Sequence, residues 1–227
     1  MRVERRPPLV RIVETMTHGR YLVQPPPSGT PRGLLVGFHG YTETAPVMLD
    51  RLMAIPGSDQ WLVASIQGLH RFYRGSAQEL AASWMTREDR DLAIRDNEAY
   101  VTGIVSTLLA EWPSCTSLVF AGFSQGVSMA FRAACASARP VDAVVALGGD
   151  VPLELSADVL GRIAHAFHGR GDHDPWYTAQ QFATDQIRLK DAGVDLTMYC
   201  FDADHVWTSV FSEAAGHFLH RLGPPGR

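Results

Sequence analysis

A serine between two glycines, Gly122-Phe-Ser-Gln-Gly126, is the segment of this sequence best suited to chemistry. The apolar residues 117–120 before it predict a buried strand, and residues 127–134 after it predict a helix because they contain no helix breaker. A Gly-x-Ser-x-Gly pattern in this context is typical of a nucleophile elbow, a sharp turn that exposes the serine hydroxyl. A glycine-rich turn with Ser124 as a helix N-cap is the alternative, and the flanking elements favour the nucleophile.

A serine hydroxyl is a weak nucleophile and needs a nearby base, which a third group must orient. In doubly wound sheets such groups follow the carboxyl ends of strands. His205 comes after the last predicted strand, residues 194–201, and is our candidate base. His217 and His220 lie three residues apart in the next predicted helix, residues 211–222, and we interpret them as helix-face residues.

Three aspartates are candidates for the orienting acid. Asp150 follows a predicted strand over residues 141–147, whereas Asp172 and Asp174 follow another over residues 163–167. Each of them comes after the serine and before His205, which is the chain order of one class of Ser-Asp-His triads. Spacing alone does not separate the three.

A metal site is the competing interpretation of the histidines and aspartates near residue 170. The group comprises His165, His168, Asp172, His173 and Asp174. His165 and His168 are three apart on a predicted strand, so we expect them on opposite faces of the sheet. The sequence also contains no His-Glu-x-x-His spacing. We therefore expect neither a metal nor another cofactor.

Strands and helices alternate along the sequence. The predicted strands are residues 33–38, 61–66, 117–120, 141–147, 163–167 and 194–201, and the predicted helices are residues 45–55, 91–111, 127–134, 178–192 and 211–222. This alternation predicts an α/β fold, with a mostly parallel, doubly wound sheet and helices on both faces. We expect residues 1–227 to form a single domain.

Two further segments flank this pattern. Residues 1–32 hold two short apolar runs, residues 9–14 and 20–24, which predict a hairpin, followed by a proline-rich loop. Residues 69–90 lack clear periodicity but are rich in aromatic side chains. Long loops in compact domains usually serve a function, so we expect this segment to be a wall or lid of a pocket.

Composition limits the class of protein. The net charge of −4 argues against nucleic-acid binding, which usually needs a basic excess. We find no apolar stretch long enough to span a membrane and no secretory signal. Cys115, Cys135 and Cys200 are widely spaced and predict free thiols, so we expect a cytoplasmic protein. The arginines at positions 2, 5 and 6 are interpreted as part of a frayed terminus, and the oligomeric state, a homodimer included, stays open.

From residue 33 to residue 218 the sequence resembles the α/β-hydrolases of the phospholipase/carboxylesterase group, which includes acyl-protein thioesterases. The resemblance is carried by Phe38-His-Gly40, Ser65-Ile-Gln-Gly68, Ser83-Trp84, the Gly122–Gly126 motif, Gly171-Asp-His-Asp-Pro175 and Asp204-His205. It implies an α/β-hydrolase fold without a separate cap domain. It also implies a serine hydrolase that cleaves small-molecule carboxylic esters or thioesters through an acyl-serine intermediate.

The resemblance also implies roles for individual residues. It assigns the catalytic acid to Asp174, beside the nucleophile Ser124 and the base His205, and the oxyanion-hole amides to Tyr41 and Gln125. The sequence departs from the family pattern at Tyr41-Thr-Glu43, at Ile66 and at Trp176-Tyr-Thr178. These departures weaken the transfer of an acyl-protein substrate but leave the catalytic residues in place.

Large side chains flank the predicted site and are candidates for an acyl pocket, although each could equally pack in the core. They are Phe72, Tyr73, Trp84, Met85, Trp176 and Trp207. Two other functional classes stay open. One is a non-catalytic binding protein with a hydrolase fold, and the other is a related acyl hydrolase such as a lactonase or a peptidase.

Overall fold

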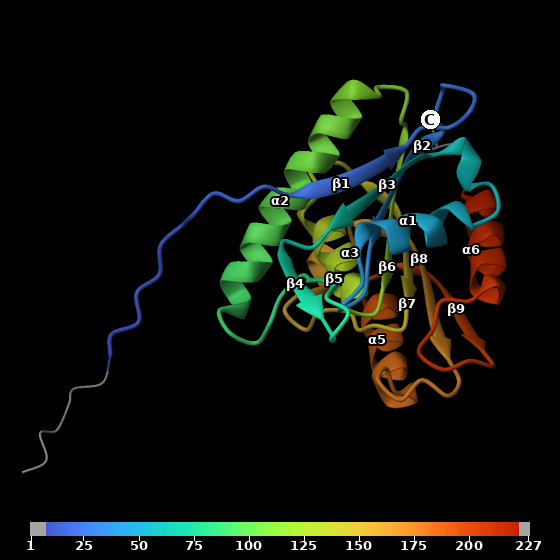
Figure 1. Ribbon diagram of the computed structural model, residues 1–227. Helices are drawn as coiled ribbons and strands as arrows, with labels where there is room; N and C mark the ends of the chain where they lie inside the picture. Colours follow the sequence, from blue (N-terminus) through green and yellow to red (C-terminus); the bar gives the residue numbers. More distant parts are fainter. Residues whose placement is uncertain (1–7, 223–227) are drawn as a thin grey trace, which may run out of the picture.

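The computed structural model describes residues 8–222 and is built around a seven-stranded sheet (Figure 1). The strand order is β1-β3-β2-β6-β7-β8-β9; β1 is antiparallel to β3, and the other neighbouring pairs are parallel. The strands are β1 (Arg20–Gln24), β2 (Gly33–Phe38), β3 (Leu62–Gln67), β4 (His70–Arg74), β5 (Glu79–Ser83), β6 (Ser117–Phe123), β7 (Val141–Leu147), β8 (Ile163–Gly171) and β9 (Asp195–Phe201). The helices are α1 (Ala45–Met53), the 3₁₀ turn η1 (Ser58–Gln60), α2 (Arg90–Glu111), α3 (Gln125–Ala136), α4 (Ala157–Leu160), α5 (Ala179–Asp191) and α6 (Ser209–Arg221).

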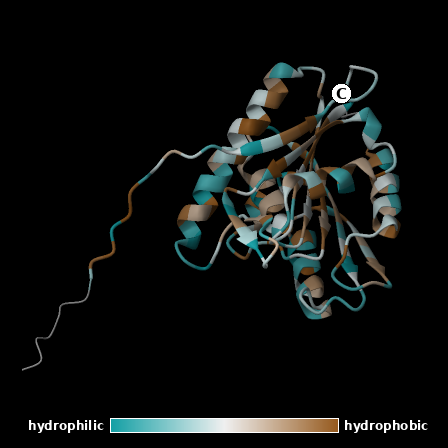
Figure 2. Ribbon diagram, viewed as in Figure 1, coloured by the Kyte–Doolittle hydropathy of each residue, from teal (hydrophilic) through white to brown (hydrophobic). Residues whose placement is uncertain are grey.

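Helices cover both faces of this sheet, as predicted. Every residue of β2 and β6 is buried, which is typical of parallel strands covered on two sides. Successive side chains point to opposite faces, so Leu34 packs in one core with residues of α2 and α3, and Leu35 packs in the other with residues of α1 and α6. Figure 1 shows α2 and α6 on opposite sides of the sheet, and Figure 2 shows the hydrophobic residues concentrated in its strands.

The five longer helices begin and end within two residues of their predicted bounds. Gly193 follows α5 with a φ of 79°, a left-handed conformation that glycine adopts without steric cost. The four-residue helix α4 was not predicted. Within residues 8–222 no helix combines the length and hydropathy needed to cross a lipid bilayer.

The prediction of a strand at residues 9–14 is wrong. Residues 8–19 form neither helix nor strand, and the chain runs away from the sheet there (Figure 1). Leu9, Val10 and Val13 are exposed, because β1 pairs along its whole length with β3 and residues 8–19 have no neighbouring strand to cover them. The arginine cluster at positions 2, 5 and 6 lies outside the described residues.

The prediction of a continuous loop at residues 69–90 is also wrong in part. Strands β4 and β5 form an antiparallel hairpin, and its turn contains two left-handed residues, Gly75 (φ 66°) and Gln78 (φ 52°). Most residues of β4 are exposed. The strand therefore lacks the alternation of apolar and polar residues that would have revealed it.

The parallel strands place four chemically useful residues at one edge of the sheet. His39 follows β2, Ser124 follows β6, Asp174 lies three residues beyond β8, and His205 lies four beyond β9. The register aligns Phe38 with Gly122 on neighbouring strands. The fold thus gathers residues that are far apart in the sequence at the carboxyl ends of the strands.

Candidate active site

Ser124 occupies a tight turn between β6 and α3. Its φ of 53° and ψ of −122° are unusual for a residue with a side chain and mark local backbone strain. A Cβ atom at Gly122 would lie 2.4 Å from the carbonyl oxygen of Gly126, and a Cβ at Gly126 would lie 2.0 Å from that of Phe38. Only glycine therefore fits at either position, and the turn presents Ser124 at the end of the strand.

A cavity of about 730 Å³ opens at this turn. Both Ser124 and His205 line it. Its wall also includes Gly40, Tyr41, Thr42, Glu43, Thr44, Val47, Arg74, Glu79, Leu80, Phe123 and Trp176. Tyr41, Leu80 and Trp176 are 56%, 52% and 77% exposed, so the cavity has an apolar rim that is open to solvent.

Asp174 and His205 form a close polar pair. The Nδ1 atom of His205 lies 2.7 Å from Oδ2 of Asp174. The other carboxylate oxygen accepts hydrogen bonds from the backbone amides of Trp176 (2.8 Å) and Tyr177 (2.9 Å). Asp174 is 4% exposed, so this set of contacts fixes a buried carboxylate and, through it, the orientation of the imidazole ring.

The structure separates the three aspartates by position. Asp174 contacts His205, whereas Asp150 and Asp172 are exposed. With Nδ1 directed at Asp174, Nε2 is the nitrogen of His205 that remains for another partner. Among residues 8–222 no hydrogen bond joins Ser124 to His205. A nucleophile and its base often reach hydrogen-bonding distance only when substrate binds.

Tyr41 lines the same cavity as Ser124, and Gln125 directly follows the serine. Gln125 is the first residue of α3, and Tyr41 lies in the loop after β2. In the part of the chain that the structure describes, the backbone amide of neither residue donates a hydrogen bond to another protein group. The first amides of a helix have no partner within it, and such amides suit a negatively charged oxygen.

His39 is buried beneath the loop after β2. Its Nε2 accepts a hydrogen bond from the amide of Gly68 (2.9 Å), so the proton resides on Nδ1, which donates to the carbonyl oxygen of Gly40 (2.7 Å). Burial lowers the pKa of His39 below its usual value. A neutral imidazole therefore joins the ends of β2 and β3.

The side chain of Gln125 holds the segment that follows β5. Its Oε1 accepts hydrogen bonds from the Trp84 amide (3.0 Å) and the Ser83 hydroxyl (3.2 Å), and its Nε2 donates to the carbonyl oxygen of Met85 (3.0 Å). The indole of Trp84 in turn donates to the carbonyl oxygen of His39 (2.9 Å). The elbow, the loop after β2 and the end of the hairpin are thus one hydrogen-bonded unit.

Of the six predicted pocket side chains, the cavity lining includes Trp176 and none of the other five. Trp84 is fully buried and packs against Phe38 and His39. Met85 is also buried. Trp207 is buried too and donates to the Ser212 hydroxyl (2.9 Å). These three are core residues, because each packs beneath the site rather than toward its opening.

The remaining two predicted pocket residues belong to β4. The ring of Phe72 lies 6.0 Å from that of Tyr41, behind the cavity rim, and Tyr73 is 70% exposed. The cavity takes Arg74, Glu79 and Leu80 from the hairpin instead. Glu79 and Leu80 were not predicted to line the pocket because the hairpin itself was not predicted. Glu43 was visible only as a departure from the family pattern.

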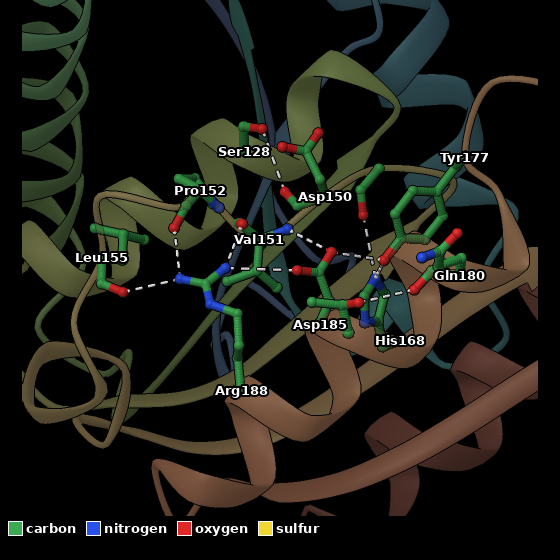
Figure 3. Close-up of polar contacts among 12 residues, drawn as sticks. Ser128, Asp150, Val151, Pro152, Leu155, His168, Tyr177, Gln180, Asp185 and Arg188 are labelled. Carbon is green, nitrogen blue, oxygen red and sulfur yellow. Dashed lines mark hydrogen bonds and ion pairs between the residues drawn. The ribbon is translucent and has the colours of Figure 1, made fainter.

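A buried polar network supports the loop that carries Asp174 (Figure 3). Nε2 of His168 lies 3.1 Å from the Tyr177 hydroxyl and 3.2 Å from the carbonyl oxygen of Gly149. The Tyr177 hydroxyl donates to Oδ2 of Asp185 (2.8 Å), which also accepts from the amide of Val151 (3.0 Å). The network connects the ends of β7 and β8 to α5.

Burial dominates the electrostatics of this network. It lowers the pKa of His168 to about 4 and raises that of Asp185. Burial, together with the neighbouring carboxylate of Asp185, raises the pKa of Tyr177. The imidazole and the phenol therefore remain neutral at physiological pH.

The histidines considered as metal ligands lie apart. His168 is buried, whereas His165 is on the other face of β8, where its Nδ1 lies 2.9 Å from Asp195. His173 is exposed and pairs with Asp202 (3.0 Å). Within residues 8–222 no three side chains of the metal-binding types come together.

One family model matches the sequence of this chain. The sequence model of the phospholipase/carboxylesterase family matches residues 79–222. No curated protein matches the chain by sequence.

Solved structures resemble the chain at low sequence identity. The esterase PE8 matches with a TM-score of 0.72 and 19% identity, over 91% of this chain and 100% of PE8. Acyl-protein thioesterase 2 of Zea mays matches with a TM-score of 0.69 and 17% identity, over 90% of this chain and 99% of its own. A phospholipase/carboxylesterase from Dyadobacter fermentans matches with a TM-score of 0.69 and 16% identity, over 92% and 99% of the two chains. These structures share the α/β-hydrolase fold with this chain.

Proposed function

The chain belongs to the phospholipase/carboxylesterase family of hydrolases, and we propose that it cleaves carboxylic esters or thioesters through an acyl-serine intermediate. In this proposal Ser124 is the nucleophile, His205 the base and Asp174 the acid. The observation that carries it is the 2.7 Å contact between His205 and Asp174 at the cavity that Ser124 also lines.

The first half of the reaction forms the acyl-enzyme. The Oγ atom of Ser124 attacks the substrate carbonyl carbon while Nε2 of His205 accepts the hydroxyl proton. Asp174 keeps the other ring nitrogen protonated and stabilises the imidazolium that results. His205 then gives the proton to the departing alcohol or thiol. In the second half, His205 deprotonates water, which attacks the acyl-serine, and then returns this proton to the departing Ser124 oxygen as the carboxylic acid leaves.

The amides of Tyr41 and Gln125 are proposed to stabilise the oxyanion of each tetrahedral intermediate. Both are free of protein acceptors within residues 8–222, and the helix dipole of α3 favours negative charge at its first turn. In other hydrolases, loss of one such donor raises the barrier by about 3–4 kcal/mol. No cofactor is needed for this chemistry.

The cavity also bears on the substrate. Tyr41, Leu80 and Trp176 give it an exposed apolar rim, which suits the apolar part of an ester. We propose a substrate with a small or medium acyl chain. The three free cysteines, of which Cys115 and Cys135 are buried, support our proposal of a reducing compartment such as the cytoplasm.

Replacement of the nucleophile is the direct test. A Ser124→Ala variant should fold normally and lose at least about 10⁴-fold of the kcat for a p-nitrophenyl ester, because no other group replaces the nucleophile. A fluorophosphonate probe should label Ser124 in the wild type and nothing in the variant. Ser128→Ala, one turn further along α3, is the matched control and should retain activity. Labelling elsewhere, or an active Ser124→Ala variant, would disprove the assignment.

A substrate panel separates the related activities. p-Nitrophenyl esters of increasing chain length, acyl-thioesters, lactones and aminoacyl anilides should be compared at equal enzyme concentration. We expect turnover of esters or thioesters. Turnover confined to lactones or anilides would favour a lactonase or a peptidase, and a lack of turnover together with a lack of labelling would favour a binding protein.

A further inference from the structure

A carboxylate lies beside the proposed oxyanion hole. Glu43 lines the cavity together with Ser124, and its side chain is 21% exposed. A lone negative charge at this place would repel the oxyanion that forms in the reaction, and partial burial would strengthen the repulsion. The carboxylate therefore needs a compensating charge.

Arg51 of α1 supplies that charge. Its NH1 and NH2 atoms lie 2.6 and 2.7 Å from the two carboxylate oxygens of Glu43, a bidentate pair. The guanidinium also lies 4.4 Å from the ring centroid of Phe123, the residue directly before Ser124. The side chain of Arg51 is 18% exposed, so the ion pair is largely shielded from solvent where Arg51 contacts Phe123.

Glu43 in turn fixes the loop after β2. Its Oε2 atom accepts a hydrogen bond from the amide of Gly40 (2.8 Å), and its own amide donates to the carbonyl oxygen of Gly40 (3.2 Å). Gly40 directly precedes Tyr41, so these two contacts set the direction of the Tyr41 amide. The carboxylate thus closes the turn that carries one of the proposed oxyanion donors.

We propose that Glu43 and Arg51 are positioning residues for the oxyanion hole. Glu43 orients the Tyr41 amide through Gly40, while Arg51 cancels the charge of Glu43 and braces Phe123 next to the nucleophile. This inference rests on the proposed function. It predicts an asymmetry, since loss of the arginine exposes a negative charge at the hole and loss of the carboxylate charge does not.

The test compares Arg51→Gln, Glu43→Gln and the double variant by kcat and KM on one p-nitrophenyl ester. Arg51→Gln should lower kcat at least tenfold and leave KM within about twofold, because the charge acts on the transition state. Glu43→Gln retains a carbonyl acceptor for the Gly40 amide and should stay within about fivefold of wild type. The double variant lacks both charges of the ion pair, so the site is neutral again. On a logarithmic scale, its kcat should recover at least half of the loss seen in Arg51→Gln.

Two further variants guard against a purely structural effect. Arg51→Lys keeps the positive charge and should lose less activity than Arg51→Gln. Arg95→Gln, on the exposed face of α2, is the arginine control and should match wild type. Melting curves should accompany every variant. If Arg51→Gln does not fold, the kcat values of Arg51→Lys and Glu43→Gln still test the inference. A larger loss of kcat in Glu43→Gln than in Arg51→Lys would contradict charge compensation.

The results that overturn the inference differ from those that overturn the proposed function. Wild-type kcat in Arg51→Gln, or a loss that the double variant does not recover, refutes the positioning role while Ser124→Ala remains inactive. An active Ser124→Ala variant would instead refute the function itself.

Discussion

The cavity has two walls that are held in different ways. One wall, formed by the loops after β8 and β9, contains Trp176 and His205. Asp174 contacts His205, and its carboxylate accepts hydrogen bonds from the amides two and three residues further along the chain. The other wall, formed by the loop after β2 and the β4–β5 hairpin, is held by contacts between residues distant in sequence, such as the hydrogen bond from the Gln125 side chain to the carbonyl oxygen of Met85. A local turn therefore holds the carboxylate of the first wall, the acid wall, whereas long-range contacts hold the hairpin of the second, the oxyanion wall.

The largest expected effect tests the acid wall. Asp174→Asn should lower kcat at least about 10³-fold, because an amide at this position no longer stabilises the imidazolium or fixes the tautomer of His205. Asp172→Asn and Asp150→Asn are matched controls, since both carboxylates are exposed, and each should stay within about threefold of wild type. Steady-state kinetics on one ester measures all three. Equal losses would show that the 2.7 Å contact does not identify the acid.

The second prediction compares Trp84, in the core beneath the oxyanion wall, with Trp176 in the acid wall. Trp84→Ala should lower the free energy of unfolding by about 3–5 kcal/mol, because it leaves a cavity in the core and removes the hydrogen bond to His39. Trp176→Ala should change it by less than about 0.5 kcal/mol, because that side chain is 77% exposed. Urea denaturation measures both. A reversed order would show that Trp176, rather than Trp84, is the tightly packed side chain.

The third prediction concerns the network behind the acid wall. His168 has a pKa of about 4 in the folded protein, below its usual value of 6.5. As the pH falls from 6.5 to 4, the unfolded chain binds this proton first, so the protein should lose about 3 kcal/mol of stability over that range. Below pH 4 the loss of stability that is due to His168 should stop, since the folded and unfolded states then both bind the proton.

The atoms of His168 explain this shift. Nε2 already faces the carbonyl oxygen of Gly149, so a second proton would go to Nδ1, which is buried and lacks a partner among residues 8–222. A His168→Asn variant should therefore show a flatter dependence of stability on pH than wild type, measured by urea denaturation at several pH values. His39 is present in both proteins, so its contribution to the pH dependence of stability is the same in wild type and variant. Equal slopes would exclude His168 as the source.

The sequence predicted the fold and the acid wall better than the oxyanion wall, for physical reasons. Buried parallel strands are largely apolar runs, and the bounds of β2 and β7 were predicted without error, whereas β6 and β8 extend three and four residues beyond their predicted ends. Asp174 and His205 lie three and four residues beyond the ends of β8 and β9, and this position made both of them candidates. The family resemblance, not the spacing, chose Asp174 among the three aspartates. The hairpin has exposed strands, and its attachment to residues 42 and 43 depends on the three-dimensional fold. The burial of Trp84 could not be predicted either, because an aromatic side chain suits a pocket and a core equally.

The attachment of the hairpin has a consequence for how substrate arrives. The Thr42 amide donates to the carbonyl oxygen of Ala82 (2.9 Å), and the Ala82 amide donates to that of Glu43 (3.1 Å). The Gln125 side chain binds the next three residues, 83–85. Opening this wall would break all these bonds at once, so the hairpin acts as a fixed support rather than a gate. We therefore expect substrate to reach the serine by diffusion alone, without a preceding conformational step.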